Sequence, residues 1–340
     1  MQQAWQIFLR QQLTNHHPLD ATDNTIFNLG AEALFHIHGG DAEDFLQSQL
    51  SNDLRDITTD KGQLSCYCNP KGRIIALLRC YPAHDGGSIG NKPSGYYLLL
   101  PESVAETVHQ RLSLYRMRAN VTIDNTTKMV HFGAMGTLVS HWLEQHDLLP
   151  DVAAYSCIAT AATQVVRIGI HRYDIMASPE HAIALWQELG TLCQIADTRY
   201  WRYINILAGL PCVHKHSSEL FIPQMLNLDL LDAISFSKGC YPGQEIIARM
   251  HYLGRNRQRM LHYFSKVGAQ ISTGMAIYGN EKSLKVGTIV DAMDNADGSC
   301  QLLATIKLDY VDQTLHAGSA QGPELQPRSL PYTIPELQPQ

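Results

Sequence analysis

The residues best suited to chemistry lie in one short stretch, which reads Lys-Gly-Cys-Tyr-Pro-Gly-Gln-Glu from position 238. Gly239 and Gly243 let the backbone turn sharply, and residues 244–250 have the pattern of an amphipathic helix. Cys240 would therefore precede a helix N-terminus and follow Lys238 by two positions. Both features stabilise a thiolate, so the pattern predicts a reactive thiol at Cys240 with Lys238 as its catalytic partner. The alternative is a buried cysteine that packs as a small hydrophobic residue.

The same stretch resembles a known family signature. Seven fixed positions and one variable position match K-G-C-Y-x-G-Q-E, which is typical of the YgfZ family. These are folate-binding proteins of iron–sulfur cluster maintenance and tRNA modification. The segments Phe221–Gln224 and Arg249–Arg259 are also similar to the family. The likeness extends over roughly residues 24–315 and is strongest between residues 200 and 259.

The YgfZ family is related in fold to the aminomethyltransferase, or T-protein, of the glycine cleavage system. The resemblance therefore implies an α+β protein of the T-protein-like fold, with two related α+β halves and a C-terminal antiparallel β-barrel. The expected boundaries are 1–125 for the first half, 126–254 for the second half with the KGCYPGQE motif, 255–317 for the barrel and 318–340 for a proline-rich, disordered tail.

Patterns along the chain agree with this organisation. Two segments, at residues 96–102 and 173–180, look like a short strand that runs into Pro-Glu and an amphipathic helix, which suggests an internal duplication. Residues 82–95 have the composition of a surface loop around Asp85-Gly86-Gly87. From residue 258 to 315 the apolar residues alternate with period two between turn signals, which is typical of a small antiparallel barrel.

The resemblance also implies a cofactor, tetrahydrofolate or a derivative. Trp201 matches a family tryptophan linked to folate binding, and its indole could stack on a pterin ring; the alternative is a core tryptophan. The full set of implied cofactor-binding residues is Trp201, Asn205, Gln224, Lys238, Tyr241, Gly243, Gln244 and Arg249.

Two positions depart from the family pattern. Leu207 stands where the family usually has a glutamate, and Glu32 stands where it has a second tryptophan. A leucine cannot accept the hydrogen bonds that a pterin edge donates. The alternatives are a weaker affinity for folate and a different way of holding it.

Cations gather after the motif. Five cations and one anion stand between residues 238 and 259, namely Lys238, Arg249, Arg255, Arg257 and Arg259 against Glu245. Guanidinium groups match carboxylates and phosphates, so this basic patch could bind the glutamate tail of folate or an RNA phosphate. The alternative is an ordinary solvated turn and strand edge.

Composition limits the other possibilities. The net charge of −6 argues against a protein that coats nucleic acid. The eight cysteines show no paired zinc spacing, so we expect reduced thiols and no resident metal; Cys66 and Cys68 are predicted to be a core pair on one strand face. The histidines of His214-Lys215-His216, close after Cys212, are predicted to lie in solvent. No leader or membrane-spanning segment is evident, which favours the cytoplasm.

Together these observations predict a folate-binding factor for iron–sulfur cluster assembly or repair. It would support cluster-dependent enzymes, including tRNA-thiolating ones, with Cys240 as the reactive thiol and a transient iron–sulfur ligand. We expect a monomer whose partners are folate, iron–sulfur carrier or client proteins and, indirectly, tRNA. Two alternatives remain: a folate-dependent aminomethyl (one-carbon) transferase, and a tRNA- or protein-binding module without catalysis. Whether the protein is an enzyme stays open.

Overall fold

The computed structural model describes residues 2–12, 24–84, 91–125, 128–254, 256–279 and 284–337. The chain forms two compact units, and each is made of two separate segments. The first unit comprises Met1–Ser65 and Leu78–Trp201, and the second comprises Cys66–Leu77 and Arg202–Gln340. This division differs from the predicted boundaries at residues 125 and 254, because each unit combines two segments that are not contiguous in sequence.

One layer of the first unit is a six-stranded sheet in the order β11-β1-β7-β10-β9-β8. Its strands are β1 (Thr25–Asn28), β7 (Val130–Met135), β8 (Cys157–Ala159), β9 (Thr163–Gly169), β10 (Arg172–Ala177) and β11 (Gln194–Asp197). β1 pairs parallel with β11, and the other described pairings are antiparallel. β1 therefore joins strands from the predicted second half, although it lies within the predicted first half in sequence.

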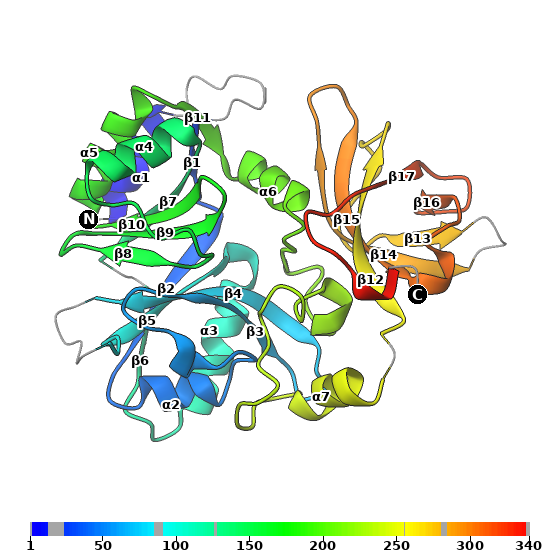
Figure 1. Cartoon of the computed structure of the whole chain (residues 1–340), viewed down its shortest axis with the longest axis horizontal. Coiled ribbons are helices and arrows are strands. Elements are labelled where there is room, and N and C mark those ends of the chain that lie inside the picture. The colour runs from blue at the N-terminus through cyan, green and yellow to red at the C-terminus, as the bar shows by residue number, and fades with distance from the viewer. Residues whose placement is uncertain are drawn as a thin grey trace. The chain divides into compact units, whose positions relative to one another are not determined.

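Three helices cover one face of this sheet: α1 (Gln2–Gln12), α4 (Thr137–Gln145) and α5 (Pro179–Gly190) (Figure 1). Aromatic side chains form the contact, because the rings of Trp5 and Trp186 meet edge to face at 5.6 Å and Phe132 packs against both. Such pairs bury large apolar areas and account for much of the core.

The second sheet has five strands in the order β3-β4-β5-β2-β6. Its elements and the helices around it are β2 (Glu32–His38), α2 (Ala42–Gln47), η1 (Leu54–Asp56), β3 (Gln63–Cys68), β4 (Ile74–Ala83), β5 (Gly95–Pro101), α3 (Glu102–Arg116) and β6 (Thr122–Asp124). The predicted core pair is confirmed: Cys66 and Cys68 are buried on β3 with their sulfurs 3.7 Å apart. Residues 85–90 of the predicted loop lie outside the described residues.

The two predicted strand–helix segments are confirmed. β5 ends at Pro101, where α3 begins, and β10 is followed by α5, whose first residue is Pro179. A proline is tolerated at the start of a helix because its missing N–H would lack an intrahelical partner there. The α+β class with two similar sheet–helix layers is therefore present as predicted.

The second unit contains a closed antiparallel barrel in the order β12-β15-β14-β13-β16-β17. Its elements are β12 (Gln258–Ser265), β13 (Ala276–Gly279), β14 (Lys285–Asp294), β15 (Cys300–Lys307), η3 (Leu308–Tyr310), β16 (Leu315–Ala317) and β17 (Glu324–Arg328), and η4 (Pro335–Leu337) follows. The predicted C-terminal barrel is thus confirmed.

The prediction that residues 318–340 form a disordered tail is wrong for the described part of that segment. β17 pairs with β12 and with β16, so the barrel closes through it. The prolines suggested a chain without ladder hydrogen bonds, but Pro327 sits within β17. Leu325 and Ile334 are buried and anchor the segment, which sequence periodicity did not reveal.

Three short helical elements follow β11 and precede β12 in the sequence: α6 (Thr198–Leu207), η2 (Pro223–Leu226) and α7 (Gln244–Tyr252). The KGCYPGQE motif runs into the start of α7. Across the described residues, no helix combines the length and the apolar character that crossing a bilayer requires.

Candidate functional site

The KGCYPGQE motif forms an irregular bend that leads directly into α7. Gly243 occupies the N-cap position in the left-handed region, with φ of 83°. A residue with a side chain is strained in that conformation, so glycine is the residue that the sharp entry into the helix requires. Cys240 lies three residues before this cap.

Gly243 also permits a close backbone contact within the second unit. A Cβ at this position would lie 2.5 Å from the Cα of Gly72 and 2.6 Å from the carbonyl oxygen of Asn69. Gly72 is itself in the left-handed region, with φ of 70°. The turn between β3 and β4 therefore packs backbone to backbone against the start of α7. Gly239, by contrast, faces open space, so a close approach at that glycine is not observed.

Cys240 differs from the other thiols in its exposure. All eight cysteines belong to the described residues, and Cys240 is the one that is exposed. Burial raises the pKa of the Cys157 and Cys300 thiols to about 12 and that of Cys193 to about 11. A buried neutral thiol is a poor nucleophile and a poor metal ligand, because the thiolate is the reactive form. Accessibility thus singles out Cys240 for chemistry with a partner molecule.

Lys238 and Tyr241 flank this thiol but turn into the protein. Both side chains are buried, and the Lys238 ammonium lies 5.4 Å from the centroid of the Tyr241 ring, a cation–π contact. Burial, together with the nearby thiols of Cys66 and Cys68, holds the pKa of Tyr241 well above its ordinary value. Tyr241 therefore serves as a neutral anchor that fixes the bend on β3.

The predicted basic patch is smaller than its sequence suggested. Arg249 and Arg257 are exposed, and Arg255 lies outside the described residues. Arg259 is 4% exposed and is bound by carboxylates, so its assignment to a ligand-binding patch is wrong.

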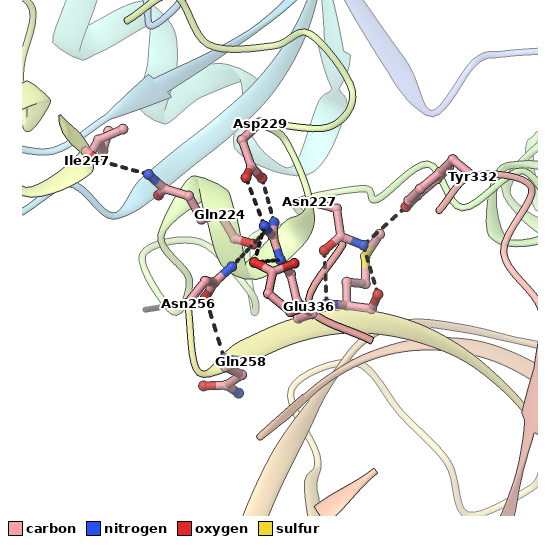
Figure 2. A network of polar contacts seen from close by, with 10 residues as sticks. Gln224, Asn227, Asp229, Ile247, Asn256, Gln258, Tyr332 and Glu336 are labelled. Carbon is pink, nitrogen blue, oxygen red and sulfur yellow. Dashed lines mark hydrogen bonds and ion pairs between the residues drawn. The ribbon is translucent and has the colours of Figure 1, made fainter. Parts of the chain in front are cut away.

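Arg259 instead belongs to a polar network in the second unit, and its partners Gln224, Asp229 and Glu336 are labelled in Figure 2. Its guanidinium donates to both oxygens of Asp229 at 2.6 and 3.0 Å and to Glu336 at 2.6 and 3.0 Å. It also donates to the carbonyl oxygen of Gln224 at 3.1 Å. The side-chain amide of Gln224 in turn donates to the carbonyl oxygen of Ile247 in α7 at 2.7 Å. Gln224 therefore links η2 to α7 and is not displayed toward a ligand.

Trp201, in the first unit, is fully buried in α6. The Arg172 guanidinium lies 3.9 Å from its ring centroid, and Phe27 packs at 4.9 Å. The six-membered ring also rests on Gly133, where a Cβ would come within 2.7 Å. In this arrangement no face of the indole is open to a pterin, so the predicted stacking role does not fit and the core alternative does.

The remaining implied binding residues are more accessible. Asn205 and Gln244 are half-buried, and Arg249 is exposed. Leu207, at the end of α6, is 37% exposed and offers no hydrogen-bond acceptor in its side chain. The predicted set is therefore divided between buried residues that hold the fold and polar residues at the surface.

Sequence reasoning missed a buried charge cluster between strands of the first unit. Arg79 on β4 pairs with Glu32 on β2 and donates to Asp174 on β10 at 2.7 Å; Tyr81 donates to the same Asp174 oxygen at 2.5 Å. His131 lies 3.6 Å from Glu32. Although burial opposes ionisation, Arg79 lowers the pKa of Glu32 to about 2. The available signal was the presence of charged residues, Glu32, Arg79 and Asp174, within strands that are largely apolar.

Glu32 and His131 also line a cavity of about 470 Å³ in the first unit. Its walls come from α1, β2, α3 and β7, and include Trp5 and His109. Because Arg79 engages both oxygens of Glu32, that carboxylate is committed to the ion pair and not to a ligand in the cavity.

Comparison with known proteins points to the same family that the motif resembles. No family model matches the sequence. The chain is 27% identical over 328 residues to the tRNA-modifying protein YgfZ of Sodalis glossinidius, with 95% of this chain and 96% of that protein aligned. Proteins of the same name from Colwellia psychrerythraea and Escherichia coli are each 26% identical, over 88% and 92% of this chain and 90% and 94% of theirs. The chain is similar to these YgfZ proteins.

The predicted relation to YgfZ is confirmed, and it extends over nearly the whole chain. Among solved structures, aminomethyltransferase T of the glycine cleavage system from Bartonella henselae has a TM-score of 0.72 at 15% identity, with 91% of this chain and 86% of that chain covered. This likeness confirms the T-protein-like fold. In this chain the motif at 238–245 leads into α7, and Trp201 lies in the core.

Proposed function

We propose that this chain serves tRNA modification, as the name of its YgfZ relatives indicates for them, by supporting the iron–sulfur clusters of tRNA-thiolating enzymes. The observation that carries the proposal is the exposed thiol of Cys240, held on a bend that Gly243 fixes against the turn at Gly72. The partners would be iron–sulfur carrier or client proteins that meet a monomer of this chain.

The chemistry assigned to Cys240 is ligand exchange at iron. Its thiol releases a proton to solvent and its sulfur donates a lone pair to an iron atom of the partner's cluster, while one thiolate ligand of that iron leaves and takes up a proton from solvent. No oxidation state changes, so no oxidant or reductant is needed. The residues around Cys240 hold its thiol in place: Gly243 sets the start of α7, and the buried side chain of Tyr241 anchors the bend.

Folate binding is a separate part of the proposal, supported by the likeness in fold to aminomethyltransferase T. The side chains implied for it do not fit a pterin as they are arranged. Trp201 is covered and Gln224 is engaged with Ile247. Leu207 also lacks the carboxylate that a folate-dependent transferase of the predicted kind would use. The proposal therefore assigns no step to folate.

Complementation tests the role of the thiol. In a bacterial host that lacks its own YgfZ, the intact chain should restore thiolated nucleosides in tRNA, measured by mass spectrometry of digested tRNA. Cys240→Ser removes the iron ligand and should leave thiolation at the level of the empty host. Cys193→Ser is the matched control, because Cys193 is half-buried in the first unit and should restore thiolation fully.

A thiol-labelling assay makes the result interpretable. With the purified chain, an aromatic disulfide reagent should modify Cys240 first, and the fastest phase should vanish in Cys240→Ser but persist in Cys193→Ser. Full restoration of tRNA thiolation by a folded Cys240→Ser protein would refute the proposed function. Equilibrium binding of tetrahydrofolate to the intact chain tests the folate part independently, since neither outcome there alters the role of the thiol.

A further inference from the structure

A second group of chemically active side chains lies in the second unit, apart from the motif. Cys212, His214 and Asp291 bring one ligand atom each within 4.8 Å of the others. They come from segments about 80 residues apart in sequence, so local composition could not reveal the group. The sequence predicted that His214 lies in solvent, but its side chain is only 21% exposed and faces Asp291.

The segment after α6 presents the first two residues on one side. Cys212 and His214 are half-buried on either side of Val213, which is fully buried. In an extended segment, residues two apart point the same way. The backbone of His214 is fixed by Ser217, whose hydroxyl accepts from the His214 N–H at 3.0 Å and donates to its carbonyl at 3.2 Å. The thiol of Cys212 and the imidazole of His214 are therefore held on the same side of the segment.

Asp291 is placed by an irregularity in the barrel. The pairing of β14 with β15 shifts register between Ile289 and Asp291, so Val290 is an extra residue at this point. Bulges of this kind redirect a side chain and are frequent next to functional sites. Asp291 is fully buried, so its carboxylate is present in the interior at the cost of its hydration.

The two carboxylate oxygens of Asp291 have different environments. Oδ1 accepts from the Arg202 guanidinium and from the Ala292 N–H at 3.0 Å. Oδ2 is buried and has no hydrogen-bond partner among the residues that the structure describes. It points toward His214, whose Nε2 lies 4.0 Å away. That separation is too long for a hydrogen bond, which spans about 2.7–3.2 Å.

The gap suits an ion between the two atoms. Zinc-like ions lie about 2.0–2.3 Å from nitrogen, oxygen and sulfur ligands, so two ligand atoms on one tetrahedral ion are roughly 3.3–3.8 Å apart. Closing the observed group onto an ion needs only small side-chain rotations. We propose that Cys212, His214 and Asp291 form a binding site for a single divalent transition-metal ion.

The donor set defines the class of ion. One thiolate, one imidazole and one carboxylate suit borderline ions such as Zn²⁺, Co²⁺ or Fe²⁺, whereas Mg²⁺ and Ca²⁺ prefer oxygen ligands. Three protein ligands leave the fourth tetrahedral position open, which is typical of sites that exchange a ligand. Arg202 acts as a positioning residue, because its hold on Oδ1 of Asp291 directs Oδ2 toward the ion.

Cobalt titration of the purified, metal-stripped full chain tests the site. Co²⁺ should bind at one equivalent and produce the visible absorption of a tetrahedral ion together with a thiolate-to-cobalt charge-transfer band. Cys212→Ser should abolish the charge-transfer band and weaken binding at least about 100-fold, more than the loss of an outer residue usually costs. His214→Gln should weaken binding to a similar degree while the thiolate band persists at saturation.

Matched controls come from neighbouring residues of the same types. Cys193→Ser and His216→Gln should bind Co²⁺ as the intact chain does. Asp291→Asn is informative if circular dichroism shows a folded barrel, but the two half-buried ligands decide the question without it. Absence of a stoichiometric Co²⁺ site in the intact chain would overturn the proposal. So would a thiolate band that survives Cys212→Ser and disappears in Cys240→Ser, since the ion would then sit on the exposed motif thiol.

Discussion

Each unit holds an arginine that is paired with two carboxylates and largely shielded from water, with side-chain exposures of 17% for Arg79 and 5% for Arg259. Arg79 in the first unit and Arg259 in the second each bind two carboxylates. The side chains of Glu32 and Asp174, the partners of Arg79, are 9% and 0% exposed. Those of Asp229 and Glu336, the partners of Arg259, are 13% and 29% exposed.

The difference shows what each cluster is for. The Arg79 cluster joins side chains from three strands, β2, β4 and β10, so it belongs to the interior of the first unit. The Arg259 cluster instead joins β12 to a loop and to η4, and it fastens the C-terminal segment (Figure 2). Breaking a fully buried pair leaves charges that water cannot reach, whereas partly exposed carboxylates regain hydration.

The largest effect should follow from removing the arginine whose carboxylate partners are more deeply buried. Arg79→Met leaves the buried carboxylates of Glu32 and Asp174 without their cation. It should lower the free energy of unfolding of the first unit by about 3–5 kcal/mol. All four tryptophans lie in that unit, so urea unfolding followed by tryptophan fluorescence reports on it selectively. Arg79→Lys, which keeps the charge but not the fork of donors, should lose less. A loss below about 1 kcal/mol in Arg79→Met would show that the cluster is not a buried ion pair in solution.

These arginines also show where sequence reasoning succeeds and fails. The period-two pattern from 258 to 315 predicted the barrel because the pattern is local, although β14 and β15 are buried over most of their length. Arg259 was assigned to a surface patch because nearby residues are cationic, yet its partner Glu336 stands 77 positions away in a segment predicted to be disordered. Long-range ion pairs leave no local signal, so this error could not be corrected from the sequence.

In the candidate site, too, the local features could be predicted from the sequence and the tertiary contacts could not. The glycine at 243 and the start of α7 follow from residue types, and so does a thiol ahead of a helix. The contact between Gly243 and the turn at Gly72 does not, because it depends on tertiary packing of segments 170 residues apart. Trp201 illustrates the opposite case: its match to a family position implied a ligand, but packing against Phe27 and Arg172 places it in the core.

The second effect is the loss of folding stability at low pH, which depends on Glu32 in the Arg79 cluster. Glu32 has a pKa of about 2 in the folded chain against an ordinary value of 4.5, because Arg79 and His131 together outweigh the opposing effect of burial. A depressed pKa contributes stability that is complete above pH 4.5 and is lost as the pH falls toward 2. The contribution is on the order of 3 kcal/mol, at 1.36 kcal/mol for each pKa unit.

Glu32→Gln isolates this contribution from other acid-sensitive groups. The variant should be less stable at neutral pH, and its tryptophan-detected unfolding free energy should fall less steeply than that of the intact chain below pH 4.5. The comparison uses the slope against pH and not the absolute stability. Parallel slopes in the two proteins would mean that Glu32 titrates normally and is not held ionised by Arg79.

The smallest of the three effects should come from the second unit. Arg259→Met removes donors to Asp229, Glu336 and the carbonyl oxygen of Gln224, but both carboxylates can recover water. We expect a loss of about 2 kcal/mol, concentrated where the C-terminal segment meets the barrel. Amide hydrogen exchange in β12 and β17 should accelerate, while the tryptophan-detected transition of the first unit stays in place. Glu336→Gln, which leaves Arg259 paired with Asp229, should cost less than about 1 kcal/mol. If Arg259→Met proved as costly as Arg79→Met, exposure of the partners would not be what separates the two clusters, and the burial of each arginine itself would be the better explanation.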